Sequence, residues 1–490
     1  MKLLMIGMDG AHLGAFNRGW TPFIESLLKQ QTAYKVNNDL YSRGWLEIAT
    51  GQHAQKTSAM YDRPKCGGSK EWTLELKFGD ITPLLEHTLP LWHAVNTAGY
   101  RVGIMNLPTT FPAPQVDGFF VSGGGGGAPV TEIATDELCH PKEVKTILED
   151  IGYIVDQRLY QLVVDKKKKD AKQIFEQMAF KNRLRTNAFI ELDRTYNVDF
   201  GFIVYKTSSV FAETFYTTEI ARRKNSGNVA DSKAIQALED YYRNFDHEIE
   251  KLRSAYPDAE LIFVSDHGTE PRQHTVNPNI LLEDIGLYTR NRSDSAIKYW
   301  VAKAKSLVPF GLKSFLKKNI SKNIQSVGAF NFDAHKTRAF CKTYGDWRHG
   351  IYLNDVDRFG GCVKREEMRP LADEIVNAFN SHKSSETHGI KARCSWSYDG
   401  NPAPWYPDVV FELPDGYLTN DMSAHYVSEF KPGKSSSALQ SIMRGDILSV
   451  KSHYPIVSST IDCQQDLTGE RDLTMVYDLI VGYFTRLEKS

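Results

Sequence analysis

Short runs of apolar residues along this chain alternate with longer segments in which apolar residues recur every three or four positions. The short runs predict buried strands, and the three- to four-residue spacing predicts amphipathic helices. Their alternation is typical of a mostly parallel sheet that is covered by helices on both faces, an α/β fold of three layers. The expected strands are Leu3–Met8, Arg101–Met105, Asp199–Tyr205, Leu261–Ser265, Ile351–Asn354 and Asp408–Leu413.

Five helices are expected between and after these strands. The most regular is Ala230–Ser254, where the apolar positions Ile235, Leu238, Tyr242, Phe245, Ile249 and Leu252 follow at helical steps. The other four are expected at Thr21–Lys29, Leu89–Ala98, Lys364–Phe379 and Leu473–Leu487.

Two segments interrupt the alternation, at about 130–195 and about 290–330. The first carries Lys166–Lys169, which indicates a solvated helix face more readily than a binding surface for an anionic partner. The second contains the basic amphipathic stretch GLKSFLKKNISKNI, for which an ordinary surface helix is favoured over membrane-surface binding. We interpret both as cap-like insertions over a single catalytic domain that spans residues 1–490.

Composition and charge narrow the class of protein. The 490 residues are 41% hydrophobic and 24% charged, as in ordinary globular proteins, and the net charge of −1 disfavours nucleic acid as a partner. No run of about 18 apolar residues is present, so no membrane span is expected. The first apolar run is short and stops at Asp9, so it resembles a first strand more than a secretory signal. The six cysteines lack CxxC spacing. We therefore expect a cytoplasmic protein with reduced thiols.

Polar residues follow two of the apolar runs abruptly. Asp9 comes directly after the first expected strand, and Asp266 and His267 follow Leu261–Ser265. Ligands of open parallel sheets bind at the carboxyl ends of the strands, so these three residues make a reasonable site for Zn²⁺ or Mn²⁺. Taken singly, Asp9 also suits a helix N-cap, and the Asp-His pair also suits an ordinary turn.

The motifs around these residues resemble the alkaline phosphatase superfamily, nearest its microbial type I phosphodiesterase/nucleotide pyrophosphatase branch. MIGMDGAH is similar to the first metal-binding strand of that family, and LEIATGQHAQKTSAM to its nucleophile helix with a Thr-Gly turn. LPLWHAVNTAGYRVGIMNLPTTFPAPQVDGFFVSG matches a helix–strand–loop stretch of the microbial branch. IFVSDHG and VNPNILLEDIGLY resemble the second metal strand and the segment after it, and HKTRAFCK, GIYLN and PDVVFELPDGY extend the likeness.

The resemblance assigns roles to individual residues. It implies that Asp9, Asp266 and His267 hold one metal ion. Counting back from the Thr-Gly turn places the nucleophile at Ser42, with Tyr41 beside it. Ser42 would then also touch the metal, attack phosphorus and form a covalent phospho-enzyme. The alternative for Ser42 is a cap of the helix through Trp45–Thr50.

At the second metal site of the family, this sequence departs from the pattern. The expected Asp and His align with Ser209 and Glu213, of which only Glu213 is a good ligand. The last ligand is expected at His453, with His425 as the fallback. Lys206 is a candidate for binding the substrate through its positive charge, or else an ordinary surface lysine. We expect one tight metal site and a second that is weaker or altered.

The function implied is metal-dependent hydrolysis of a phosphodiester or phosphoanhydride, with a small phosphate ester or nucleotide-like molecule as the substrate. A phosphomonoesterase or phosphotransferase with a dedicated biosynthetic substrate is the first alternative. The second is a degenerate member that binds a phosphorylated ligand without turnover, because the fold alone does not settle function. The exact substrate and the oligomeric state do not follow from the sequence.

Overall fold

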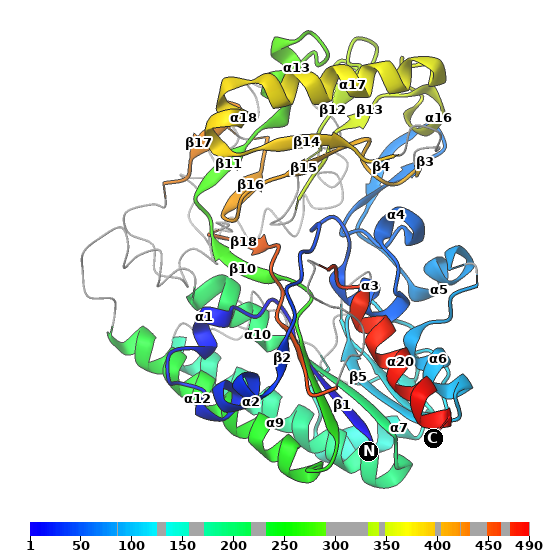
Figure 1. Ribbon diagram of the computed structural model, residues 1–490, viewed down its shortest axis with the longest axis vertical. Helices are drawn as coiled ribbons and strands as arrows, with labels where there is room; N and C mark the ends of the chain where they lie inside the picture. The colour runs from blue at the N-terminus through cyan, green and yellow to red at the C-terminus, as the bar shows by residue number, and fades with distance from the viewer. Residues whose placement is uncertain are drawn as a thin grey trace, which may run out of the picture.

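The computed structural model describes residues 1–85, 87–124, 134–155, 171–216, 232–290, 332–342, 348–396, 403–421, 423–431, 448–461 and 471–489. Its centre is an eight-stranded sheet in the order β2-β19-β9-β1-β8-β5-β6-β7 (Figure 1). These strands are β1 (Leu3–Met8), β2 (Thr32–Ala33), β5 (Val102–Leu107), β6 (Gly118–Ser122), β7 (Cys139–His140), β8 (Phe200–Tyr205), β9 (Glu260–Val264) and β19 (Val457–Ser459).

The central strands of this sheet are parallel. β1 lies between β8 and β9 and runs parallel to both, and β5 continues the parallel order from β8 to β6. The outer strands β19, β2 and β7 pair antiparallel to their neighbours. Four predicted strands, those near residues 3–8, 101–105, 199–205 and 261–265, therefore form the core of the sheet, as expected.

Alternate residues of β1 face opposite layers of helices. Leu4, Ile6 and Met8 belong to the apolar core on one face, and Leu3 and Met5 to the core on the other. A strand buried on both faces reads as a continuous apolar run, which is what its sequence shows. The α/β/α fold class is confirmed.

Each face has its own helical layer. The first contains α2 (Pro22–Gln30), α7 (Val144–Ile151), α9 (Ala171–Tyr196) and α12 (Ser232–Ala255). The second contains α3 (Gly44–Thr50), α6 (Leu91–Thr97) and α20 (Met475–Lys489) (Figure 1). The shorter helical segments of this part are α1 (Leu13–Phe16), α4 (Ala54–Thr57), α5 (Phe78–Ile81), η1 (Thr82–Leu84), η2 (Asp136–Leu138), α10 (Thr207–Ser209) and the π-helical η3 (Val210–Tyr216).

A third apolar cluster lies outside the sheet, in the part drawn at the top of Figure 1. It packs α13 (Pro278–Asp284) and α17 (Arg365–Ser381) with two small antiparallel sheets. Its neighbouring elements are α16 (Val356–Phe359), α18 (Lys383–His388), β3 (Arg63–Cys66), β4 (Ser69–Thr73), β10 (Gly268–Pro271), β11 (His274–Val276), β12 (Ala339–Phe340), β13 (Tyr352–Leu353), β14 (Lys391–Cys394), β15 (Val409–Glu412), β16 (Tyr417–Thr419), β17 (Val427–Glu429) and β18 (Ser449–Ser452).

This region corrects the placement of two predicted strands. The runs at Ile351–Asn354 and Asp408–Leu413 do form β13 and β15, but β13 pairs with β12 and β15 with β14, each antiparallel. Neither joins the central sheet among the described residues. An apolar run indicates that a segment is buried but not what it is buried against. Here β13 and β15 are buried against α17 and within their own small sheets.

The structure describes part of the first expected insertion, whereas almost all of the second lies outside the described residues. Within 130–195, the described part includes α7 and α9, and α9 packs into the core on the face that it shares with α12. Residues 291–330 and the lysine run Lys166–Lys169 lie outside the described residues. No helix in the described part of the chain is long and apolar enough to cross a membrane.

Candidate metal and phosphoryl site

Asp9 follows β1 at the carboxyl edge of the central sheet. Its backbone N–H donates to the carbonyl of Tyr205 at 3.3 Å, so the end of β1 stays in register with β8. The side chain is 8% exposed, and its Oδ2 accepts a hydrogen bond from Nε1 of Trp45 on α3 at 2.8 Å. The carboxylate is therefore oriented by α3, the helix that follows the loop of Ser42.

Asp266 and His267 come two residues after the neighbouring strand β9. Oδ1 of Asp266 accepts the N–H of Gly10 at 3.1 Å, which ties this carboxylate to the turn after Asp9. The side-chain amide of Asn38 donates to the carbonyl of Asp266 at 2.8 Å. The parallel strands thus bring together Asp9 and the Asp-His pair, which are more than two hundred residues apart in sequence.

His267 is fully buried and held in one tautomer. Its Nδ1 donates to the carbonyl of Gly268 at 2.6 Å, which leaves Nε2 as the atom with a lone pair. Nε2 lies 3.6 Å from Oδ2 of Asp266. Burial and, secondarily, the charge of Lys451 lower the pKa of His267 to about 3, so the ring is neutral, as a metal ligand must be.

Glu213 completes a group of metal-ligating side chains. Ligand atoms of Asp9, Glu213 and His267 lie within 4.8 Å of one another, and Oε1 of Glu213 is 3.6 Å from Nε2 of His267. Burial, together with the charge of Asp9, raises the pKa of Asp266 well above its ordinary value. Several carboxylates around one neutral imidazole fit a Zn²⁺ or Mn²⁺ ion, because such an ion would balance their charge.

Lys451 is a residue of this site that sequence reasoning missed. It lies on β18, paired with Thr269 of β10, and its ammonium group contacts Nε2 of His267. It is 3.8 Å from Oε1 of Glu213 and 5.0 Å from the centre of the Tyr61 ring. The only signal was a single lysine inside the otherwise uncharged run ILSVKSH.

Ser209 and Lys206 are the other residues expected near the second metal position. Ser209 lies beside the site, since a Cβ on Gly10 would come within 2.9 Å of both the Ser209 Cβ and the His267 Cε1. The hydroxyl of Ser209 donates to the carbonyl of Lys206 at 3.0 Å, and Lys206 itself is half-buried just after β8.

The two candidate histidines lie apart from this group. Nδ1 of His453 faces the carbonyl of Asn38 at 2.9 Å, and its Nε2 faces the carbonyl of Leu413 at 2.7 Å and contacts Arg348. The group of Asp9, Glu213 and His267 does not include His453. His425 is exposed, in the loop before β17.

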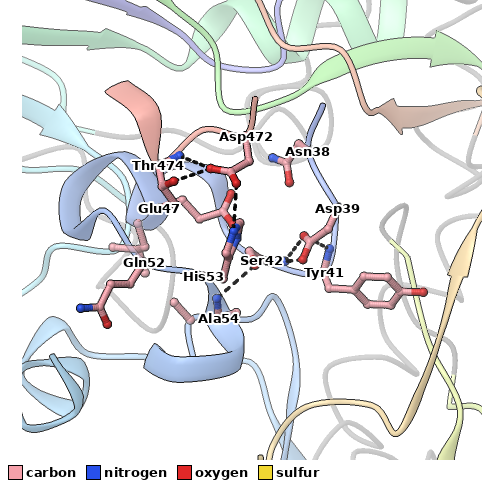
Figure 2. Close-up of polar contacts among 12 residues, drawn as sticks. Asn38, Asp39, Tyr41, Ser42, Glu47, Gln52, His53, Ala54, Asp472 and Thr474 are labelled. Carbon is pink, nitrogen blue, oxygen red and sulfur yellow. Dashed lines mark hydrogen bonds and ion pairs between the residues drawn. The ribbon is translucent and has the colours of Figure 1, made fainter. Parts of the chain in front are cut away.

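Ser42 lies in the loop between β2 and α3 and is fully buried (Figure 2). Its Oγ accepts the N–H of Ala54 at 3.1 Å and donates to Oδ2 of Asp39 at 3.4 Å. The hydroxyl therefore meets the first residue of α4 and not the start of α3, whose N-cap, Arg43, makes no side-chain cap. The hydroxyl of Tyr41 points elsewhere and accepts the N–H of Phe411 at 2.7 Å.

The loop of Ser42 is packed against the segment of Asp266 that follows β9. Besides the contact from Asn38, a Cβ on Gly44 would approach the carbonyl oxygen of Asp266 to 2.3 Å. A side chain at position 44 would therefore push α3 away from Asp266. The glycine allows the loop of Ser42 and the segment of Asp266 to touch.

The chain is similar to several phosphoryl-transfer and phosphonate enzymes of known structure. Phosphonoacetate hydrolase of Sinorhizobium meliloti 1021 matches at a TM-score of 0.54 and 11% identity, over 99% of this chain and 96% of that one. Murine ectonucleotide pyrophosphatase/phosphodiesterase 5 matches at 0.45 and 12%, over 99% and 95%. The alkaline phosphatase PafA matches at 0.47 and 12%, over 98% and 95%. At these identities the likeness concerns the fold.

Sequence comparison gives the family. No curated protein matches the chain. Residues 3–344 match the model of the family described as type I phosphodiesterase / nucleotide pyrophosphatase, and this range includes Asp9, Ser42, Asp266 and His267. Because the match covers more than half of the sequence, the chain belongs to the type I phosphodiesterase/nucleotide pyrophosphatase family of the alkaline phosphatase superfamily.

Proposed function

We propose that this phosphohydrolase cleaves a phosphodiester or phosphoanhydride of a small, nucleotide-like molecule, with Ser42 as the attacking group. The observation that carries the proposal is the meeting of Asp9, Asp266 and His267 at the carboxyl ends of two adjacent parallel strands. When bound there, Zn²⁺ or Mn²⁺ supplies Lewis-acid stabilisation of the charge on a phosphoryl oxygen. The family description supports the choice of a diester or pyrophosphate bond.

The chain's own residues prepare this site before any substrate arrives. Trp45 orients Asp9, the N–H of Gly10 orients Asp266, and the carbonyl of Gly268 fixes the tautomer of His267. Such outer contacts hold ligating groups in place and set their basicity. The site is therefore preorganised by hydrogen bonds from the turns and the helix around it.

Lys451 gives the site a fixed positive charge. Its side chain is 10% exposed, and its ammonium group lies among His267, Glu213 and the ring of Tyr61. A cation held in a largely water-excluded site stabilises the negative charge of a phosphoryl group in the transition state. We assign to Lys451 the electrostatic role that the sequence suggested for Lys206.

Asp39 is the proton acceptor that the geometry offers to Ser42. The Ser42 hydroxyl already points at Oδ2 of Asp39, and Oδ1 of the same carboxylate accepts the backbone N–H of Ser42 at 3.0 Å. On attack, the Ser42 Oγ–P bond forms, the bond to the leaving oxygen breaks, and the Ser42 proton passes to Asp39. A base within hydrogen-bond reach of the nucleophile is the usual arrangement in covalent catalysis.

The test is turnover of a chromogenic phosphodiester by Ser42→Ala. We expect the rate to fall by several orders of magnitude, as for the loss of a covalent nucleophile. Ser459→Ala is the matched control, because Ser459 is also buried and its hydroxyl also accepts a backbone N–H, that of Ile461 at 2.9 Å. If Ser42→Ala keeps the rate of Ser459→Ala, Ser42 only caps α4, and direct attack by water replaces the covalent mechanism.

A further inference from the structure

A second group of metal-ligating side chains surrounds Ser42, with Asp39 on the side of Tyr41 and Glu47 and His53 on the opposite side (Figure 2). Ligand atoms of Asp39, Glu47 and His53 all lie within 4.8 Å of one another. None of these three belongs to the site built on Asp9, Asp266 and His267. They come from the nucleophile loop, from α3 and from the residue before α4.

His53 lies between two carboxylates. Its Nδ1 is 2.5 Å from Oε1 of Glu47, and its Nε2 is 3.2 Å from Oδ2 of Asp472, just before α20. Asp472 is held in turn by the N–H of Thr474 at 2.9 Å. The group therefore joins three segments near residue 50 to the carboxyl-terminal part of the chain.

Glu47 supplies an independent sign of a missing ligand. It is 1% exposed, and its Oε2 has no hydrogen-bond partner among the described residues. Its carboxyl group points toward His53 in Figure 2. Leaving a buried carboxylate oxygen unpaired costs about 1–3 kcal/mol or more, so such an oxygen is normally bound by something.

The charges of this group also call for a cation. Three carboxylates, those of Asp39, Glu47 and Asp472, surround one imidazole, so the group stays negative even when His53 is protonated. The ion pairs that Glu47 and Asp472 make with described residues both go to His53. The side chains of His53 and Asp472 are 43% and 41% exposed, which leaves a path from solvent.

We propose that Asp39, Glu47 and His53 form a second divalent-cation site, with Asp472 beside it, that binds Mn²⁺ or Zn²⁺. A mixture of carboxylate and imidazole ligands suits these ions. The ion takes up the unpaired oxygen of Glu47 and replaces the proton that His53 shares with its neighbours. This inference does not depend on which phosphate bond the enzyme cleaves.

An ion bound in this group would hold the loop of Ser42 in place. Asp39 accepts the N–H groups of Tyr41 and Ser42, at 2.9 and 3.0 Å, so whatever fixes Asp39 also fixes the nucleophile loop. The ion would link this loop to α3 through Glu47 and to α4 through His53. Its role is to position Ser42, without contact with the substrate. Because a bound cation draws charge from Asp39, the ion would also make that carboxylate a weaker proton acceptor for Ser42.

The alternative is a purely protonic network. Hydrogen bonds to Asp472 and Glu47 raise the pKa of His53 to about 11, so without metal the ring is an imidazolium that bridges both carboxylates. Burial raises the pKa of Glu47 to about 7, so a proton on this carboxyl group is part of the same alternative. A cation must displace this proton to reach a ring nitrogen. Direct measurement of metal binding distinguishes the two states.

The experiment uses the full chain with the first site disabled by Asp9→Asn and Asp266→Asn. Calorimetric titration with Mn²⁺, and metal analysis after Zn²⁺ loading, should still show about one ion per chain. Adding Glu47→Gln should abolish this binding, because it removes a ligand charge while keeping the side-chain shape. Glu248→Gln is the matched control, since Glu248 is also buried with an unpartnered Oε2 but lies on α12, outside either group.

His53→Gln decides the question if Glu47→Gln does not fold, because the His53 side chain is substantially exposed. In that variant Mn²⁺ should no longer raise the melting temperature of the disabled chain. The proposal is overturned if the disabled chain binds neither Mn²⁺ nor Zn²⁺. It is equally overturned if Glu47→Gln or His53→Gln leaves the binding at the level of Glu248→Gln.

Discussion

The contact between Trp45 and Asp9 leads to a sharp prediction for Trp45→Phe. The indole is 3% exposed and serves two purposes. Its ring packs against Phe202, with centroids 6.0 Å apart, and against Gly7, where an added Cβ would come within 2.8 Å of it. Its Nε1–H also donates to Oδ2 of Asp9. Phenylalanine keeps an aromatic ring and removes the donor.

The magnitude follows from the type of hydrogen bond that is lost. A hydrogen bond to a charged group contributes about 1.5–3 kcal/mol, and about 1.4 kcal/mol corresponds to a factor of ten in affinity. Removing an outer contact of a metal ligand commonly lowers metal affinity by about 10–100-fold. Both lines of reasoning give the same range. We therefore expect Trp45→Phe to weaken Mn²⁺ binding at the Asp9 site by about 10–100-fold.

Trp92→Phe provides the control. Trp92 on α6 is fully buried in the same apolar cluster, and its Nε1 has no hydrogen-bond partner among the described residues. Both variants lose the same part of an indole ring, so their melting temperatures should fall by similar amounts. Calorimetric titration with Mn²⁺ should then separate them. Equal Mn²⁺ affinities for Trp45→Phe and Trp92→Phe would refute the claim that Trp45 orients a metal ligand.

Three further predictions concern the same site. Asp266→Ala should remove most of the tightly bound metal and the activity while circular dichroism stays that of the native fold, and full metal stoichiometry in this variant would contradict the assignment. Metal analysis of washed Glu47→Gln protein, in which the second proposed cation site is removed, should give closer to one ion than two per chain, and Glu213→Ala should impair turnover more than retention of that ion. Two equally tight ions in the Glu47→Gln protein, with Ser209 as a ligand of one, would contradict this. Lys451→Met should lower kcat/KM for an anionic phosphodiester by about 10²-fold in steady-state assays, and Lys451→Arg should recover part of this loss. Equal rates in the wild type and both variants would show that the ammonium group has no electrostatic role.

Periodicity alone predicted four of the eight strands of the central sheet, β1, β5, β8 and β9. The run at Leu3–Met8 became β1 with the same bounds, and the helical spacing in Ala230–Ser254 became α12, Ser232–Ala255. These patterns are local, since a strand buried on both faces must be apolar throughout and an amphipathic helix must repeat its apolar positions. The parallel order of the sheet follows from the alternation of strands and helices.

The meeting of Asp9 with Asp266 and His267 was also predictable. Each follows an apolar run at its carboxyl end, and parallel strands bring those ends to one edge of the sheet. That argument needs only the strand assignments and the polar residue types. The family resemblance added Glu213, which the structure places beside His267.

Contacts between distant segments were decided by the tertiary structure. No local pattern shows that Lys451 of β18 reaches His267, that Nε1 of Trp45 meets Asp9, or that Asp472 pairs with His53. His453 had the residue type and motif of a ligand, yet its ring faces the carbonyls of Asn38 and Leu413.

Sequence by itself therefore determined the four central parallel strands, the helices α2, α6, α12 and α20, and the meeting of Asp9 with Asp266 and His267. These features depend on the spacing of buried residues and on where the strands end. Tertiary structure decided the partners of β13 and β15, the hydrogen bonds of the Ser42 hydroxyl, and the contact of the Lys451 ammonium group with His267. An apolar run does not indicate which strand it will pair with, and a hydroxyl group does not indicate which residue it will hydrogen-bond to. In both cases the partner is selected by the packing of segments that lie hundreds of residues apart.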